Sequence, residues 1–125
     1  MPIDATKPYD TNNIFARILR GEIPCSKVYE DEHALAFNDI NPQAPTHILV
    51  IPKGAYVSWD DFSEHASSEE IAGFVRAVGR IAREAGLLEP GYRLLANTGP
   101  NSGQEVPHLH VHIFAGRLLG PMLSR

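Results

Sequence analysis

The sequence predicts an α+β domain built on an antiparallel sheet of about five strands with two helices. Three observations favour this fold. Short β-branched runs follow one another across brief turns, one long segment has helical periodicity, and residues 108–114 alternate between polar and apolar. Because strands joined by short turns pair antiparallel, whereas parallel strands need long crossovers, an antiparallel sheet is preferred over a parallel α/β arrangement.

The composition indicates a single globular domain, which we expect to span residues 1–125. Apolar residues make up 43% of the chain and charged residues 21%, which is ordinary for a globular protein. The net charge of −4 argues against a nucleic-acid partner, so any anion site must be local. A single cysteine, Cys25, excludes an internal disulfide, and no apolar run is long enough to cross a membrane. We therefore expect a cytoplasmic protein with no membrane partner.

The N-terminal half predicts an arm, one short helix and three strands. Residues 1–10 contain two prolines and no periodicity, so a loose arm is expected. Residues 11–13 offer N-caps for a helix over 14–20, and Gly21 suits its C-terminal end. The predicted strands are 28–30, 34–38 and 48–51.

The clearest helix lies between Ser67 and Gly86. Ser67 and Glu70 form a capping-box pattern, and apolar residues recur at helical spacing after them. The stripe expected to be buried comprises Ile71, Phe74, Val75, Val78, Ala82 and Ala85. Residues 59–62 are interpreted as a helix start or a packing feature. A strand over 93–96, a turn-rich loop over 97–103 and an irregular tail over 116–125 complete the pattern.

Three histidines alternate with apolar residues near the C-terminus, at His108, His110 and His112. Alternation is the strand period, so the three imidazoles should project from one face while the apolar residues between them enter the core. On a straight strand His108 and His112 would lie about 13 Å apart. Histidine serves proton transfer, phosphoryl attack or metal binding near neutral pH.

Three interpretations of the histidines are open. They are polar residues on a solvated strand face, or ligands of a metal ion, or a catalytic group in which the middle imidazole attacks phosphorus. The metal interpretation needs a further ligand such as His33, His47 or Asp39. A span of about 13 Å from His108 to His112 is too long for all three histidines to bind one ion.

The preceding loop favours attack on phosphorus. Gly99 and Gly103 allow backbone amides to approach an anion, and Asn97, Ser102 and Gln104 add neutral donors.

The pattern His108-x-His110-x-His112, followed by apolar residues 113–114, resembles the histidine-triad (HIT) motif of nucleotide hydrolases and transferases. The resemblance extends to residues 14–18, 21–24, 36–42, 44–53, 97–99, 103–106 and 116–117. It is closest to the Hint branch, the purine nucleoside phosphoramidases.

The resemblance implies a five-stranded antiparallel sheet and a homodimer whose sheets join into ten strands. It also implies hydrolysis of purine nucleoside 5′-phosphoramidates to a nucleoside monophosphate through a covalent nucleotidyl-histidine, without a cofactor. His110 would attack the α-phosphorus and His112 would bind a non-bridging oxygen, while His108 and His47 would be buried supports.

The resemblance also assigns nucleotide contacts. Asn97 and the amides of Gly103, Gln104, Glu105 and Val106 would bind phosphate. Asp39 would accept from the ribose hydroxyls, although a plain turn role is the alternative. The base slot would be lined by Phe37, Ile40 and Ile18, for which a core role is the alternative.

Two departures from the family pattern matter. Some relatives bind zinc through Cys-x-x-Cys at the opening helix, where this chain has Asn13 and Ala16, so we predict no metal. Glu105 stands where relatives carry a serine, and its role is open; facing the ligand, it would disfavour highly charged leaving groups. The alternative functions are a dinucleoside polyphosphate hydrolase and a nucleotide-binding scaffold with incidental turnover.

Overall fold

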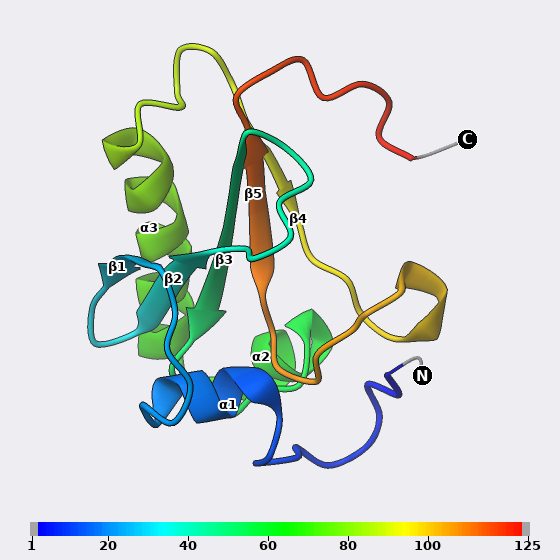
Figure 1. The fold of residues 1–125 in the computed structure, drawn as a ribbon. Helices are drawn as coiled ribbons and strands as arrows, with labels where there is room; N and C mark the ends of the chain where they lie inside the picture. The colour runs from blue at the N-terminus through cyan, green and yellow to red at the C-terminus, as the bar shows by residue number, and fades with distance from the viewer. Residues whose placement is uncertain (1–2, 124–125) are drawn as a thin grey trace.

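The computed structural model describes residues 3–123 and contains one five-stranded sheet (Figure 1). Its strands are β1 Lys27–Glu30, β2 Ala34–Asn38, β3 Thr46–Pro52, β4 Arg93–Leu95 and β5 Val111–Ala115. Their spatial order is β1-β2-β3-β5-β4, and every neighbouring pair runs antiparallel. The predicted sheet is confirmed, and β3 and β5 each have a strand on both sides.

The helices are α1 Ile14–Leu19, α2 Trp59–His65 and α3 Ser68–Glu84, with a 3₁₀ turn at Pro100–Ser102. The expectation of two helices is wrong, because α2 is a third helix. With seven residues it is too short for helical periodicity to be evident in the sequence. It begins at Trp59, where the sequence indicates a helix start. The Ser58 side chain caps it by accepting from the Asp61 amide.

The long helix α3 begins as predicted, with both hydrogen bonds of the Ser67–Glu70 capping box present. Its buried residues are Phe74, Ala77, Val78, Ile81 and Ala82. Val75 is 54% exposed and Ala85 is also exposed, so the expected stripe is wrong at these two positions. Each residue turns the helix by about 100°, which places Val75 outside the face that contacts the sheet.

The two faces of the sheet carry separate apolar clusters. Ala34 and Ala36 of β2 belong to the cluster that includes the buried face of α3. Leu35 and Phe37, which alternate with them, pack with Phe15 of α1 on the other face. Because both faces are covered, β2 and β3 read as continuous apolar runs instead of alternating ones.

The strand β5 begins at Val111, three residues later than the sequence predicts. Val111 pairs with Val50 of β3, whereas the Leu109 amide donates to the Tyr56 carbonyl at 2.8 Å and so leaves the ladder. His108 and His110 therefore lie in the segment that leads into β5. The alternation persists, because Leu109, Val111 and Ile113 all join the α3-side cluster.

The two chain ends, as far as residues 3–10 and 116–123, form neither helix nor strand. The arm is nevertheless held at one point, because the Tyr9 hydroxyl lies 2.6 Å from a ring nitrogen of His108. The remaining predicted positions, 1–2 and 124–125, lie outside the described residues.

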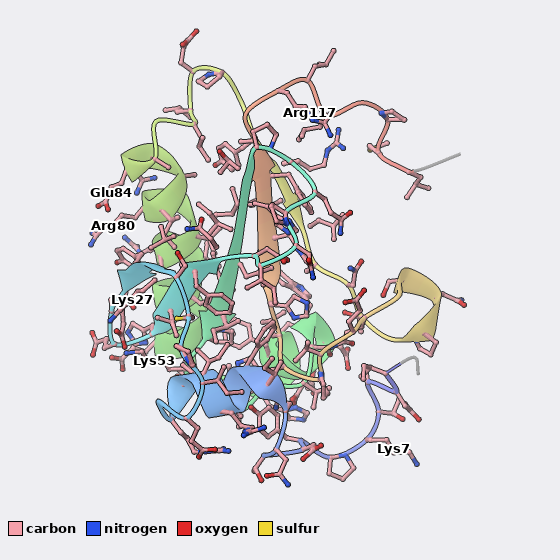
Figure 2. The ribbon with its side chains drawn as sticks, in the orientation of Figure 1. Lys7, Lys27, Lys53, Arg80, Glu84 and Arg117 are labelled. Carbon is pink, nitrogen blue, oxygen red and sulfur yellow. The ribbon has the colours of Figure 1, made fainter. Side chains whose placement is uncertain are left out.

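Charged side chains lie on the outside of this arrangement. Figure 2 shows Lys27 and Lys53 beside β1, and Arg80 and Glu84 on α3. Both lysines pair with Glu30, at 2.9 and 2.8 Å. Within residues 3–123 no helix has the length and apolar character needed to cross a bilayer.

Replacing Phe74 by alanine tests the α3-side cluster. The ring is 1% exposed and packs edge-to-face on Phe62, so its loss should lower the free energy of unfolding by about 3–5 kcal/mol. Urea unfolding measures the change. Arg76→Ala on the exposed side of the same helix is the control and should change stability by less than about 0.5 kcal/mol.

Candidate active site

A pocket of about 140 Å³ opens beside the segment that leads into β5. It is lined by Phe15, Asp39, Gln43, Leu49, Asn97, Gly103, Glu105, Val106, His110 and His112. Seven of these ten residues are candidates from the sequence, drawn from three separate stretches of the chain. The fold therefore gathers most of the predicted site in one place.

The His110 ring has an unprotonated nitrogen, Nε2, whose lone pair is free. Its Nδ1 lies 2.7 Å from the His108 carbonyl oxygen, which only accepts, so Nδ1 carries the proton. Burial lowers the pKa of His110, which keeps the imidazole neutral near pH 7. Nε2 is then unprotonated, and a neutral imidazole nitrogen in this state is a nucleophile.

His108 is fully buried and supports this geometry from behind. Its Nε2 lies 2.9 Å from the Pro52 carbonyl oxygen at the end of β3, so Nε2 carries the proton. Burial, with a smaller contribution from the neighbouring His110, lowers the pKa of His108 to about 4. His108 is therefore neutral with a fixed tautomer.

A second chain of hydrogen bonds fixes the protons on His47 and His112. The Gln43 amide donates to His47 Nδ1 at 3.1 Å, so His47 carries its proton on Nε2. That proton is donated to His112 Nδ1 at 2.9 Å, which leaves the His112 proton on Nε2. His112 Nε2 is buried and has no hydrogen-bond partner among the described residues. Since His112 lines the pocket, this N–H is available to an oxygen of a bound ligand.

Burial also keeps this second pair neutral. It lowers the pKa of His112 to about 4, with the nearby His110 and His47 acting in the same direction. Burial lowers the pKa of His47 as well, against the opposing effect of Asp39. The site thus holds four imidazoles with one proton each near pH 7.

Two aromatic rings hold the imidazoles in place, and the sequence assigns a role to neither. Phe114 stacks on His112 with 4° between the ring planes, and its centroid is 4.3 Å from that of His47. Phe15 meets the edge of His110 at 5.0 Å. Phe114 continues the alternation of the histidines, so the same period could have placed it on their face. Nothing local in the sequence shows that α1 carries Phe15 to the site.

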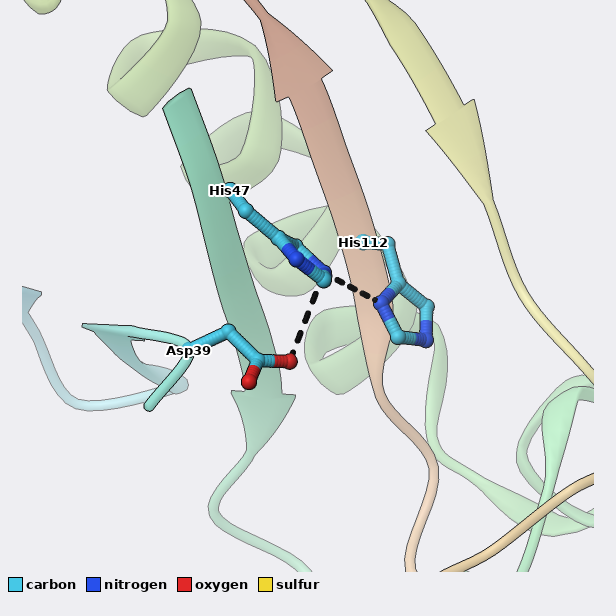
Figure 3. A group of neighbouring side chains, drawn as sticks. All are labelled: Asp39, His47 and His112. Carbon is cyan, nitrogen blue, oxygen red and sulfur yellow. Dashed lines mark hydrogen bonds and ion pairs between the residues drawn. The ribbon is translucent and has the colours of Figure 1, made fainter. Parts of the chain in front are cut away.

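Asp39, His47 and His112 form a cluster with metal-ligating chemistry, because one ligand atom of each lies within 4.8 Å of the others (Figure 3). The hydrogen-bond pattern accounts for these atoms without an ion. His47 Nε2 donates to His112 at 2.9 Å and lies farther, at 3.4 Å, from Asp39 Oδ2. A metal ion between the two rings would have to replace that proton and separate the nitrogens. The predicted absence of a metal stays a prediction.

The loop before the histidines is built differently from expectation. The Gln104 side chain is buried, where it accepts from the Gly99 amide and donates to the carbonyls of Val57 and Val106. The backbone amides of Gly103 and Gln104 donate within the loop, to the Pro100 and Gly99 carbonyls.

The amides of Gly103 and Gln104 are thus used within the loop, and their contact with phosphate stays a prediction. The Ser102 hydroxyl is also used inside the loop, on the Gly99 carbonyl. Among the described residues the amides of Glu105 and Val106 have no protein acceptor, so they remain available to an anion. Gly99 and Gly103 both have φ of 76°, a conformation that suits glycine.

The apolar residues assigned to the base slot do not line this pocket. Phe37 is buried against Phe15, and Ile18 lines a separate hollow beside Leu35 and Lys53. Ile40 is 90% exposed, next to Asp39. Their contact with a base stays a prediction.

The two positions on which the prediction of no metal rests have structural roles in α1. Asn13 is the N-cap of α1, since its side chain accepts from the Ala16 amide at 2.9 Å and donates to the Asp10 carbonyl. Ala16 is buried.

The family model described as HIT domain matches residues 20–119. The chain belongs to the HIT family. It is 71% identical over 119 residues to a 13.2 kDa HIT-like protein of Azospirillum brasilense, covering 95% of this chain and 98% of that one. It is 47% identical over 112 residues to the purine nucleoside phosphoramidase of Escherichia coli K12. That alignment covers 89% of this chain and 92% of the Escherichia coli protein. The structure of a HIT family hydrolase of Legionella pneumophila superposes with a TM-score of 0.80 at 43% sequence identity. The match covers 87% of this chain and 96% of that one.

Stability should fall as the pH decreases from about 6.5 toward 4, because His108 resists protonation in the folded state. In that range the unfolded chain binds more protons than the folded chain, so acidification favours unfolding. Urea unfolding between pH 4.5 and pH 7.5 measures this dependence. His108→Gln should reduce the slope of the unfolding free energy against pH. His65→Gln, at an exposed position, should leave the His108 contribution to that slope intact. An equally steep slope in His108→Gln would contradict the assignment.

Proposed function

We propose that this HIT-family protein hydrolyses purine nucleoside 5′-phosphoramidates through a covalent nucleotidyl-His110 intermediate. One observation carries the proposal. The hydrogen bonds leave a lone pair on His110 Nε2 and an unpartnered N–H on His112 Nε2, and both residues line one pocket. A nucleophile beside a donor is the arrangement that attack on a phosphoryl group requires.

In the first step His110 Nε2 attacks the α-phosphorus and the P–N bond breaks. The amine leaves with the electron pair of that bond and takes a proton from solvent. The His112 N–H binds a non-bridging oxygen, and the His108 carbonyl holds the Nδ1 proton as positive charge develops on His110. In the second step water attacks phosphorus, the P–Nε2 bond breaks, and the monophosphate leaves with one proton released.

The charge around the pocket favours an amine leaving group over a polyphosphate. The described residues that line it include two carboxylates, Asp39 and Glu105, and no lysine or arginine. A polyphosphate leaving group would bring several negative charges to a site without a cationic side chain. A phosphoramidate brings one phosphoryl group and an amine that gains a proton. The similarity to the Escherichia coli purine nucleoside phosphoramidase supports the same choice.

We place the nucleoside over Asp39. Its Oδ1 accepts from the Asn41 amide at 2.8 Å, which fixes the carboxylate in the turn while Asp39 still lines the pocket. A carboxylate oriented in this way suits the ribose hydroxyls. The exposed side chain of Ile40 beside it supplies an apolar surface for a base.

The decisive experiment is a rapid-quench mass spectrum of the protein mixed with adenosine 5′-phosphoramidate. We expect a transient adduct with the mass of an adenylyl group, which disappears in His110→Ala. Turnover should fall by roughly three orders of magnitude or more in that variant, as it does when a nucleophile is lost. His65→Ala, at an exposed histidine outside the pocket, is the matched control and should keep both adduct and rate.

Two outcomes would contradict the proposal. Retention of more than about a tenth of the rate in His110→Ala would remove this residue from the nucleophilic role. Absence of both adduct and adenosine monophosphate in the wild type would exclude the phosphoramidate substrate. A dinucleoside polyphosphate, tested in parallel, then separates the polyphosphate hydrolase from a nucleotide-binding scaffold.

We further propose that two copies join through β4, which forms one edge of the sheet. This edge and the adjoining outer face expose large apolar side chains, at Trp59, Val75, Tyr92 and Leu94. They line two hollows of about 250 and 360 Å³. A second copy with the same edge would cover these side chains and join the two sheets into ten strands.

Leu94→Glu tests this interface, because Leu94 is 48% exposed at its centre and a carboxylate there would be desolvated in a dimer. Sedimentation equilibrium should show a dimer for the wild type and a monomer for Leu94→Glu. Val28→Glu, at a 41% exposed residue on the opposite edge strand β1, should remain dimeric. A monomeric wild type or a dimeric Leu94→Glu would rule this edge out.

A further inference from the structure

The N-terminal arm reaches the catalytic histidines through one side chain. Tyr9 lies outside helix and strand, yet its hydroxyl is 2.6 Å from His108 Nδ1, across 99 residues of sequence. The two rings also meet edge-to-face, with centroids 5.5 Å apart. In Figure 1 the arm (dark blue) leaves the N-terminal end of α1 and passes below the segment that leads into β5.

The direction of this hydrogen bond follows from the other side of the ring. His108 Nε2 donates to the Pro52 carbonyl, and a neutral imidazole has one proton, so Nδ1 is the acceptor. Tyr9 therefore donates its hydroxyl proton to His108. Burial raises the pKa of Tyr9, which keeps the phenol protonated and able to donate.

We infer that Tyr9 is a positioning residue for the His110 nucleophile and acts through His108; this inference rests on the proposed function. The Tyr9 hydroxyl and the Pro52 carbonyl hold the His108 ring from opposite nitrogens. The backbone carbonyl of His108 accepts the hydrogen bond from His110 Nδ1 at 2.7 Å. Holding His108 in place therefore aims the carbonyl that leaves the lone pair on His110 Nε2.

Loss of the Tyr9 hydroxyl would leave a buried acceptor without a partner. His108 Nδ1 would then either stay without a donor or become protonated. Protonation occurs by transfer of the Nε2 proton, which breaks the bond to Pro52, or by uptake of a second proton. The groups that face His108 are the Tyr9 hydroxyl from the arm, the imidazole of His110, the Pro52 carbonyl of β3 and the Phe15 ring of α1. A second proton would thus place positive charge directly beside His110 and weaken it as a nucleophile.

Tyr9→Phe removes the hydroxyl and keeps the ring packed on His108. We expect kcat for adenosine 5′-phosphoramidate to fall about three- to tenfold, the range of one lost hydrogen bond. KM should be unchanged, because Tyr9 does not line the pocket. The acidic limb of the kcat–pH profile should move to higher pH, because an acceptor without its donor is protonated more easily.

Tyr29→Phe is the matched control. Its hydroxyl donates to Asp31 at 2.6 Å in the turn between β1 and β2, so the same atom is lost far from the histidines. It should leave kcat, KM and the pH profile unchanged.

Nitrogen-15 NMR of the histidine rings tests the inference without any substrate. In the wild type at pH 7, His108 should carry its proton on Nε2 with Nδ1 as acceptor, and His110 should carry its proton on Nδ1. In Tyr9→Phe the His108 ring should titrate at higher pH. If Tyr9→Phe does not fold, the wild-type spectrum still decides, because a His108 proton on Nδ1 would overturn the inference.

The combined outcomes separate this inference from the proposed function. An altered His108 titration with unchanged kcat would make Tyr9 a structural tie and overturn the positioning role. Unchanged His108 titration in Tyr9→Phe would overturn it too. A wild type that does not cleave the phosphoramidate refutes the proposed function and with it the positioning role, while the spectra still establish whether Tyr9 holds His108.

Discussion

Burial of the histidines leaves each of them with one proton, and the chemistry of the site depends on where that proton lies. An imidazole in water exchanges its tautomers and takes up a second proton near neutral pH. Here His108 and His112 are buried enough to hold their pKa near 4, so the charged form is excluded around pH 7. The remaining protons of His47, His108 and His110 are then placed by backbone groups that only accept or only donate, and His47 in turn places that of His112.

Two backbone groups on β3 and the chain after β2 anchor these assignments. The Pro52 carbonyl fixes the proton of His108, and the Gln43 amide fixes that of His47. From Gln43 the pattern passes through His47 to His112, while the backbone carbonyl of His108 fixes the proton of His110 directly. The outcome is a lone pair and an N–H presented to the same pocket. Because backbone atoms set the pattern, the fold itself orients these two nitrogens before any ligand binds.

The sheet explains why such a site is compatible with a stable small domain. Alternate residues of the central strands enter two clusters, so the α3 side supplies an apolar core that is separate from the histidines of the pocket. The other side combines the Phe15 cluster with the imidazoles. Phe114 and Phe15 pack against the imidazoles and thereby exclude water from them, which lowers their pKa values. The same packing that stabilises the domain thus lowers the pKa of the proposed nucleophile.

The sequence by itself determined the strand pattern, the capped helix α3 and the alternation that sends Leu109, Val111 and Ile113 into the core. It also singled out the histidines and most residues of the pocket, because periodicity and residue type are local properties. Tertiary structure alone decided where β5 begins, since the Tyr56 carbonyl captures the Leu109 amide. It also turned Gln104 inward and brought Tyr9 and Phe15 to the histidines. Those contacts join residues far apart in the chain, and no periodicity within one segment encodes which distant group a side chain will meet.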